Sequence, residues 1–139
     1  GLGLPNGSPQ VTLHGKHGCL RAMLAVLGDG STYLGLQDNN GEVGAGLSVM
    51  PDGTQRLALC DKDHKTRAGL SVMPDGSPTL ALSDKEGKGS VALSVMPDGT
   101  GLTLTDKDGK RRIALSAMPD GRPGLALFDK EGKILWKAP

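Results

Sequence analysis

Apolar residues alternate with small or polar ones in short runs along most of this chain. Between residues 68 and 72, Ala68, Leu70 and Val72 fall on one side of the alternation, and Gly69 and Ser71 fall on the other. A period of two is typical of a β-strand whose two faces meet different surroundings. Because a Gly or Pro also occurs every few residues, helices of useful length are excluded. The pattern therefore predicts an all-β chain built from short strands.

This pattern is repeated in tandem. The octapeptide at 46–53 recurs at 69–76, 92–99 and 114–121, and its leucines are spaced by 23, 23 and 22 residues. A second alternating run follows each copy, and two degenerate copies come earlier in the chain. Self-similarity at a fixed period indicates a repeat architecture, here a single repeat domain over residues 1–139 without a linker. We place the six repeats at residues 1–22, 23–45, 46–68, 69–91, 92–113 and 114–139.

Two kinds of turn connect the predicted strands. In the sequence Met50-Pro51-Asp52-Gly53, Pro51 favours a φ of about −65°, and Gly53 favours the left-handed conformation that closes a three-residue hairpin with a bulge. The run 106–110, with the sequence DKDGK, follows the same logic with Lys in place of Pro. His64 occupies the left-handed position in the third repeat, at a cost of about 1 kcal/mol. Tight turns at both strand ends predict an up-and-down antiparallel meander of about twelve strands.

The leucines of the repeats fall on one face of this meander. Twist accumulates across a sheet, so we expect about twelve strands to close, fold over or wrap against other copies. A β-prism or solenoid-like arrangement completed by homo-oligomerisation is favoured. A propeller of 46-residue blades ranks third, since no 46-residue alternation is apparent. We expect one continuous apolar interior, completed partly by other chains, from Leu47, Leu57, Leu59, Leu70, Leu80, Leu82, Leu93, Leu102, Leu104, Leu115, Leu125 and Leu127.

A methionine precedes the proline of each regular turn, at Met50, Met73, Met96 and Met118. By alternation these side chains lie on the face opposite the leucines. One interpretation is an adaptable contact ridge on a face of small residues. The other is that each methionine covers its own turn and contacts no partner.

Composition and charge exclude several classes of protein. Sixteen Lys and Arg against fifteen Asp and Glu give a net charge of +1, so no field attracts nucleic acid or an anionic membrane. Tyr33, Phe128 and Trp136 are the only aromatic residues, which leaves almost no stacking surface for bases or sugars. No apolar run approaches the ~20 residues of a membrane span. We therefore expect no nucleic-acid partner and no membrane contact by this segment.

No arrangement of residues typical of a catalytic site occurs in the sequence. The GxSxG, P-loop and HExxH motifs are absent, and no GxGxxG opens a helix. The many carboxylates lie at solvated turns, where nothing shifts a pKa toward acid–base catalysis. The run 6–8 has the form of a glycosylation acceptor but precedes Pro9, and we interpret it as a turn. We predict a protein that is not an enzyme, with no catalytic residues and no cofactor.

Two groups of residues are candidate metal ligands. His14, His17 and Cys19 lie within one predicted turn, but a structural zinc usually needs four ligands and no CxxC partner exists. The run 106–109 shares two carboxylates and a Gly with a calcium loop, yet lacks the other acidic ligands. We interpret the first group as incidental substitutions and the second as turn chemistry, so no metal site is predicted. In a flat meander Cys60 lies too far from Cys19 for a disulfide.

The sequence resembles a group of uncharacterised bacterial tandem-repeat proteins. The shared unit is D-K-x-G-K-x-R-x-x-L-x-V-x-P-D-G-x-P-x-L-x-L-x-D, which residues 106–129 follow with Ala117 in place of Val. The ending at 132–139, GKILWKAP, is similar to their G-K-x-x-W-x-A-P tail. Those proteins often carry a membrane segment before the repeats, so the resemblance implies an extracytoplasmic or cell-surface location. In architecture the repeats are also similar to phage tail-fibre and bacterial surface-fibre modules, which are commonly trimeric.

These observations lead to two functional hypotheses. The first is a non-catalytic structural or interaction scaffold of a bacterial exterior or a phage-like fibre. It would act as a homo-oligomer, with a trimer as the first expectation. The alternative is a lectin-like repeat module that binds a glycan or a peptide in shallow grooves, one per hairpin. Only Ser, Met, Asp and Lys recur at equivalent positions, which weakens the alternative.

Overall fold

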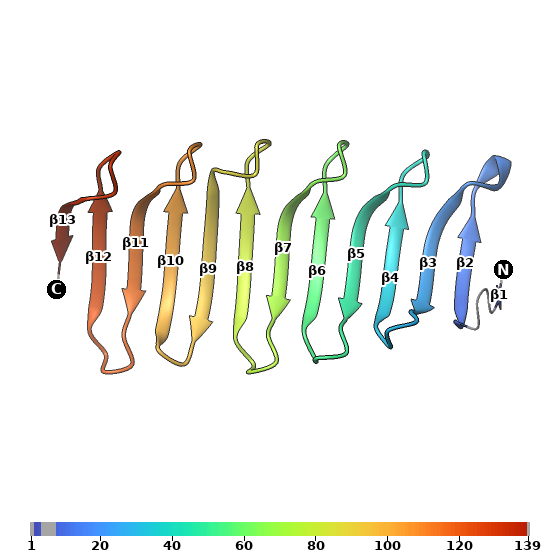
Figure 1. Ribbon diagram of the computed structural model, residues 1–139, viewed down its shortest axis with the longest axis horizontal. Coiled ribbons are helices and arrows are strands. Elements are labelled where there is room, and N and C mark those ends of the chain that lie inside the picture. Colours follow the sequence, from blue (N-terminus) through green and yellow to red (C-terminus); the bar gives the residue numbers. More distant parts are fainter. Residues whose placement is uncertain (1, 4–7, 139) are drawn as a thin grey trace. The chain divides into compact units, whose positions relative to one another are not determined.

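The computed structural model describes residues 2–3 and 8–138, and its regular structure there is β apart from one short turn of 3₁₀ helix, η2 (Lys16–Gly18) (Figure 1). The all-β prediction is confirmed. Within the described residues the strands are β1 (Leu2–Gly3), β2 (Gln10–His14), β3 (Leu20–Val26), β4 (Thr32–Gln37), β5 (Val43–Val49), β6 (Gln55–Cys60), β7 (Thr66–Val72), β8 (Pro78–Ser83), β9 (Ser90–Met96), β10 (Gly99–Thr105), β11 (Arg111–Ala117), β12 (Pro123–Phe128) and β13 (Ile134–Ala138).

The strands fall into two compact units, and the division runs through β7. Unit 1 comprises Gly1–Thr66 and Ser71–Pro74, and unit 2 comprises Arg67–Leu70 and Asp75–Pro139. In unit 1 strands β1 to β6 pair antiparallel in chain order. Strands β8 to β13 do the same in unit 2. The expected up-and-down antiparallel meander is therefore confirmed in each unit.

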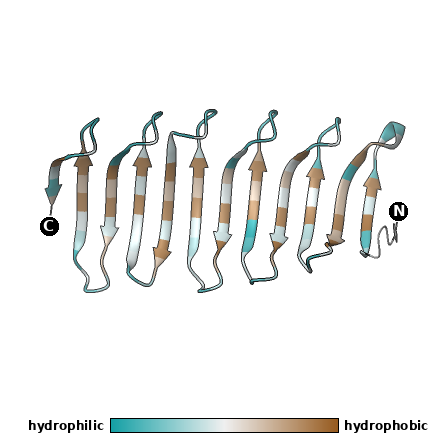
Figure 2. Cartoon of the chain, viewed as in Figure 1, coloured by the Kyte–Doolittle hydropathy of each residue, from teal (hydrophilic) through white to brown (hydrophobic). Residues whose placement is uncertain are grey.

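The leucines lie side by side on one face of each sheet, because the register between strands keeps equivalent positions opposite one another. Bands of apolar residues cross neighbouring strands at the same height in Figure 2. We call this surface the leucine face. Its central row is Val11, Leu24, Leu34, Leu47 and Leu57 in unit 1, and Leu80, Leu93, Leu102, Leu115 and Leu125 in unit 2.

The opposite face carries mostly small residues, and we call it the small-residue face. In unit 2, Ser94 lies opposite Gly101, which in turn lies opposite Ser116. In unit 1 the ring of Tyr33 lies over Gly35, where a Cβ atom would stand 2.5 Å from it. Glycine at that position therefore makes room for the Tyr33 ring.

Neither unit encloses a hydrophobic core. Among the described residues Ala25 is the one buried apolar side chain, with 5% of its surface exposed. Leu47 and Leu93, in the middle of the leucine face, are 47% and 44% exposed. A single layer of strands has nothing to pack on either face, so the expected alignment of leucines is observed but their burial is not. A continuous interior completed by other chains stays a prediction.

The predicted turn geometry is confirmed at most positions. At the turn of residues 50–54, the Gly53 amide donates to the Met50 carbonyl at 2.9 Å, and Gly53 has a φ of 87°. His64 is left-handed, as expected, with a φ of 58°. The turn after β9 differs, because Met96 pairs directly with Gly99 and leaves a loop of only two residues. Gly99 consequently belongs to β10 and has a φ of 134°.

Candidate functional site

The candidate metal ligands do not converge on a site. Both ring nitrogens of His14 are engaged: Nδ1 donates to the Gly18 carbonyl at 2.9 Å, and Nε2 lies 3.2 Å from the Thr12 hydroxyl. Cys19 and Cys60 are free thiols. In the part of the chain that the structure describes, no three His, Cys, Asp or Glu side chains are placed to hold a metal ion. Residues 6 and 7 of the glycosylation-like run lie outside the described residues.

At one end of the strands, an aspartate is the first residue of each regular turn, and its carboxylate accepts backbone amides of the same turn. Asp61 Oδ1 accepts the amides of Asp63 at 2.8 Å and Lys65 at 3.2 Å. The same pair of bonds is made by Asp38, Asp84, Asp106 and Asp129. The carboxylates of the calcium-like run 106–109 thus serve the turn itself, which is how such residues favour turns in general.

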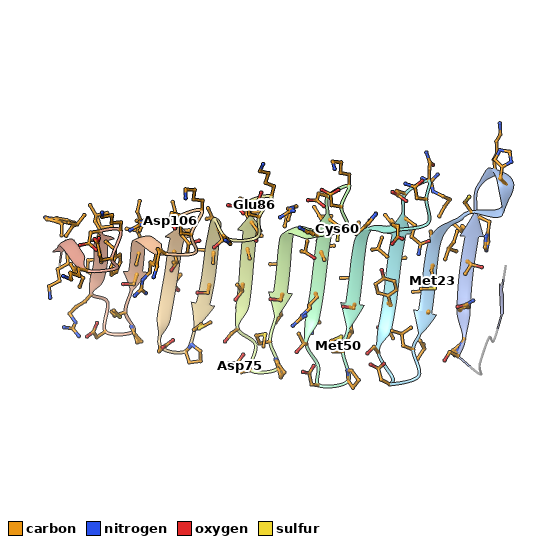
Figure 3. All side chains as sticks on the ribbon, turned by 45° about the horizontal axis from the view of Figure 1, so that its top comes forward. Met23, Met50, Cys60, Asp75, Glu86 and Asp106 are labelled. Atoms are coloured by element: carbon orange, nitrogen blue, oxygen red, sulfur yellow. The ribbon has the colours of Figure 1, made fainter. Side chains whose placement is uncertain are left out.

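At the other end of the strands, the aspartate is the third residue of the turn rather than the first. Asp52 Oδ1 accepts the amide of Thr54 at 2.8 Å, and Asp75 Oδ1 accepts that of Ser77 at 2.9 Å. Thr54 and Ser77 are among the few buried residues of the described chain. In unit 2, Figure 3 shows Asp75 at one end of the strands and Glu86 and Asp106 at the other end. Carboxylates therefore lie at both ends of the strands, and the aspartates named above accept backbone amides.

These contacts hold the carboxylates in their ionised form. Backbone hydrogen bonds from Lys110 and Lys88 lower the pKa of Asp106 and Asp84. The amide of Thr54 lowers the pKa of Asp52 in the same way. Since an accepted hydrogen bond favours the charged form, these groups are tuned away from acid–base catalysis at neutral pH.

The direction of these pKa shifts predicts acid-induced destabilisation. A folded-state pKa below the unfolded value contributes stability that is present above about pH 4 and lost as pH falls further. We expect the melting temperature to be nearly constant from pH 7 to about 5 and to fall below about 4. High salt should change this little, because the partners are backbone amides rather than distant charges. Thermal melts followed by circular dichroism at each pH measure this. A melting temperature that rises on acidification to pH 2 would contradict the lowered pKa of the turn aspartates.

An arginine follows three of these turns, and its side chain donates to the backbone of the next turn at the same end of the strands. Arg112 binds the carboxylate of Asp106, with Nε 2.6 Å from Oδ2, and donates to the Asp129 carbonyl. Arg67 donates to the carbonyls of Asp84 and Lys85. Arg21 donates to the Gln37 carbonyl at 3.0 Å. We call these three residues the arginine clamps.

The clamps reveal a longer period that corrects the sequence analysis. Arg21, Arg67 and Arg112 are 46 and then 45 positions apart, and Gly44 and Ser90 occupy the intervening equivalent positions. The expectation that no 46-residue alternation exists is therefore wrong. The sequence shows this alternation at the residue six positions after the start of each turn. The strand pattern does not point to that position, because it distinguishes only apolar from polar residues.

The comparisons with known proteins leave the function to be argued from the structure. No protein-family model matches the sequence, and no curated protein matches it either. Among the described residues, no helix has the length and apolar character required to cross a bilayer.

Proposed function

We propose that this protein is a non-catalytic structural module that assembles with copies of itself through the leucine face. The supporting observation is the central leucine row, which lies in register within each unit. Eight of its ten members are 41–54% exposed. Exposed apolar residues scattered singly need no explanation, but a contiguous apolar surface marks an interaction site. Each copy offers the same surface that another copy needs to cover.

The accessible surface of the chain supports a partner of substantial size. It amounts to 9302 Å², whereas a compact monomer of 14.3 kDa exposes about 6,800 Å². The surplus is about 2,500 Å² per chain, or about 5,000 Å² for two copies, which lies at the upper end of the total area of roughly 2,000–5,000 Å² that obligate homodimers bury. A small ligand would cover only a fraction of it. An area of this size favours a protein surface of similar extent as the partner.

A second copy fits this surface better than an unrelated partner. With sixteen basic and fifteen acidic residues the chain has almost no net repulsion against itself. The apolar rows are regular, so the side chains of two facing sheets can interdigitate about 10 Å apart, as in β-sandwiches. Closed symmetric assembly would also bury the faces of all copies equally.

The resemblance to bacterial tandem-repeat and surface-fibre proteins supports placing this scaffold outside the cell. In that setting we expect a trimer first, since fibre modules of similar architecture are commonly trimeric. The aspartates are engaged in turn bonds, in keeping with a structural rather than catalytic role. The arginine clamps then act as braces between successive turns.

Light scattering of the purified protein tests the proposal. We expect a mass that is a small multiple of 14.3 kDa and that persists on dilution, because a dissociated layer has little core of its own. Hydrogen exchange on the same sample should show slow exchange for the central strands of both units. A protein that is strictly monomeric at the highest concentration reached would overturn the proposal.

A further inference from the structure

The turn between β2 and β3 keeps the backbone frame of the other turns but lacks their aspartate. The Gly15 amide donates to the Cys19 carbonyl at 2.9 Å, and the Gly18 amide donates to the Gly15 carbonyl at 3.3 Å. The corresponding bonds in the third repeat join Asp61 to Lys65 and His64. Gly15 therefore occupies the place of the aspartate, and no carboxylate is available there to accept the amides of the turn.

The missing carboxylate changes the local backbone. His17 has a φ of 68°, and within the described chain His64 is the only other non-glycine residue with a positive φ. In the turns with an aspartate, the residue equivalent to His17 donates its amide to the carboxylate, as Asp63 does to Asp61. At this turn, where that acceptor is missing, His17 takes the left-handed conformation instead, with a ψ of 16°.

Arg21 has the same place relative to Gly15 that Arg112 has relative to Asp106. Arg112 pairs with the Asp106 carboxylate. Among the described residues, Arg21 donates only to uncharged acceptors, the Gln37 carbonyl and Asn39 Oδ1 at 2.6 Å. A Cβ atom on Gly15 would lie 3.1 Å from Arg21 Cγ. Arg21 thus corresponds to the cation of the Arg112–Asp106 ion pair, but Gly15 replaces the carboxylate that would be its partner.

A hollow of about 410 Å³ lies at this point, lined by Gly15, Lys16, His17, Cys19, Arg21 and Asn39. Two of these residues are permanent cations, a third is a histidine, and none is acidic. Arg and Lys around a concave site without a counter-charge favour an anionic ligand. The hollow is also large enough for a small organic acid.

We propose that this hollow binds the carboxylate of a small organic acid, which takes the place of the aspartate that the other turns carry. One carboxylate oxygen would accept from the Arg21 guanidinium. The other would lie against the turn beside Cys19, the position equivalent to Lys65, whose amide Asp61 accepts. Lys16 adds charge at the entrance. In the Asp106 turn, Oδ1 accepts the two turn amides and Oδ2 accepts from Arg112. A ligand that repeats this pattern needs two oxygens in one plane, which favours a carboxylate over a tetrahedral phosphate. The site lies in one turn of unit 1 and goes beyond the structural function proposed above.

An NMR titration of the full chain with acetate, succinate, phosphate and chloride tests the site. We expect acetate and succinate to shift the amides of His17 and Cys19 saturably, while the amides of Lys65 and Lys110 stay unchanged as internal controls. Two variants separate binding from folding. Gly15→Asp supplies the carboxylate from within, and Arg21→Gln removes the cation; each should weaken binding about tenfold or more, the size of one charge-assisted hydrogen bond.

The outcomes are distinguishable from failure of the structural proposal, because the amides report on a single turn whatever the assembly state. Equal affinity for acetate in the wild type and in Gly15→Asp would overturn the proposal. A response to chloride equal to that to acetate would do so as well. Tighter binding of phosphate than of succinate would assign the hollow to phosphate and refute the carboxylate.

Discussion

A chain in which Leu93 and Leu115 are both replaced by Asp should no longer assemble. Both residues lie in the central row of the leucine face of unit 2, on either side of Leu102. Covering a leucine side chain fully is worth about 1.5–3 kcal/mol, and a carboxylate in its place must be desolvated without a partner. We expect the association constant to fall by at least about 1000-fold, or roughly 4 kcal/mol. The melting temperature should fall with it, since a single layer has little core.

The matched control places the same charges on the other side of the same strands. Ser94 and Ser116 lie on the small-residue face, each opposite Gly101, and the double change of both to Asp should leave the assembly intact. Light scattering and melting curves at equal protein concentration compare the two variants. Dissociation by the serine variant with retention of assembly in the leucine variant would mean that the copies meet through the small-residue face instead.

Replacing Gly99 by Ala is expected to be the most damaging single change at any turn. Gly99 has a φ of 134°, and a Cβ atom there would lie 2.7 Å from the backbone carbonyl oxygen of Ala117. The alanine would pay for the positive φ and also for the close approach of its Cβ atom to a backbone oxygen, and a change of side-chain rotamer relieves neither. We therefore expect a loss of about 2–3 kcal/mol in the free energy of unfolding.

Gly53→Ala provides the comparison for that change. Gly53 also has a positive φ, 87°, but nothing lies within 4 Å of its missing Cβ atom. The cost there should be only the conformational one, about 1 kcal/mol. Denaturant unfolding at fixed protein concentration measures both variants. Equal losses for the two would show that the approach to Ala117 does not constrain the β9–β10 turn.

The tighter turn at Gly99 could be predicted from the sequence, although the shared Met-Pro-Asp-Gly motif obscures it. Leu93 and Leu102 are nine positions apart, whereas Leu47 and Leu57 are ten apart. The missing residue comes out of the loop, because the strand register keeps the leucines opposite one another. The motif therefore specifies a turn, while the spacing of the rows specifies its length.

Strands, repeats and turns were accessible to sequence reasoning because alternation and turn chemistry are local properties. The arginine clamps were not, since Arg67 reaches residues 17 and 18 positions away and the strand register decides which backbone it meets. The hollow at Gly15 depends on what one repeat lacks relative to the others. Its nearest signal in the sequence is the Gly that replaces Asp in an otherwise recognisable turn.

The arginine clamps also bear on how a chain of this kind can gain or lose length. A single hairpin contains everything that the strand register and the turns require, so a step of 23 residues would preserve the leucine rows. It would, however, put the clamp arginines out of phase, because they occur once every 46 or 45 positions. Copy number is therefore expected to change in pairs of hairpins. In a gene that evolves by duplication, the heritable module is two hairpins long.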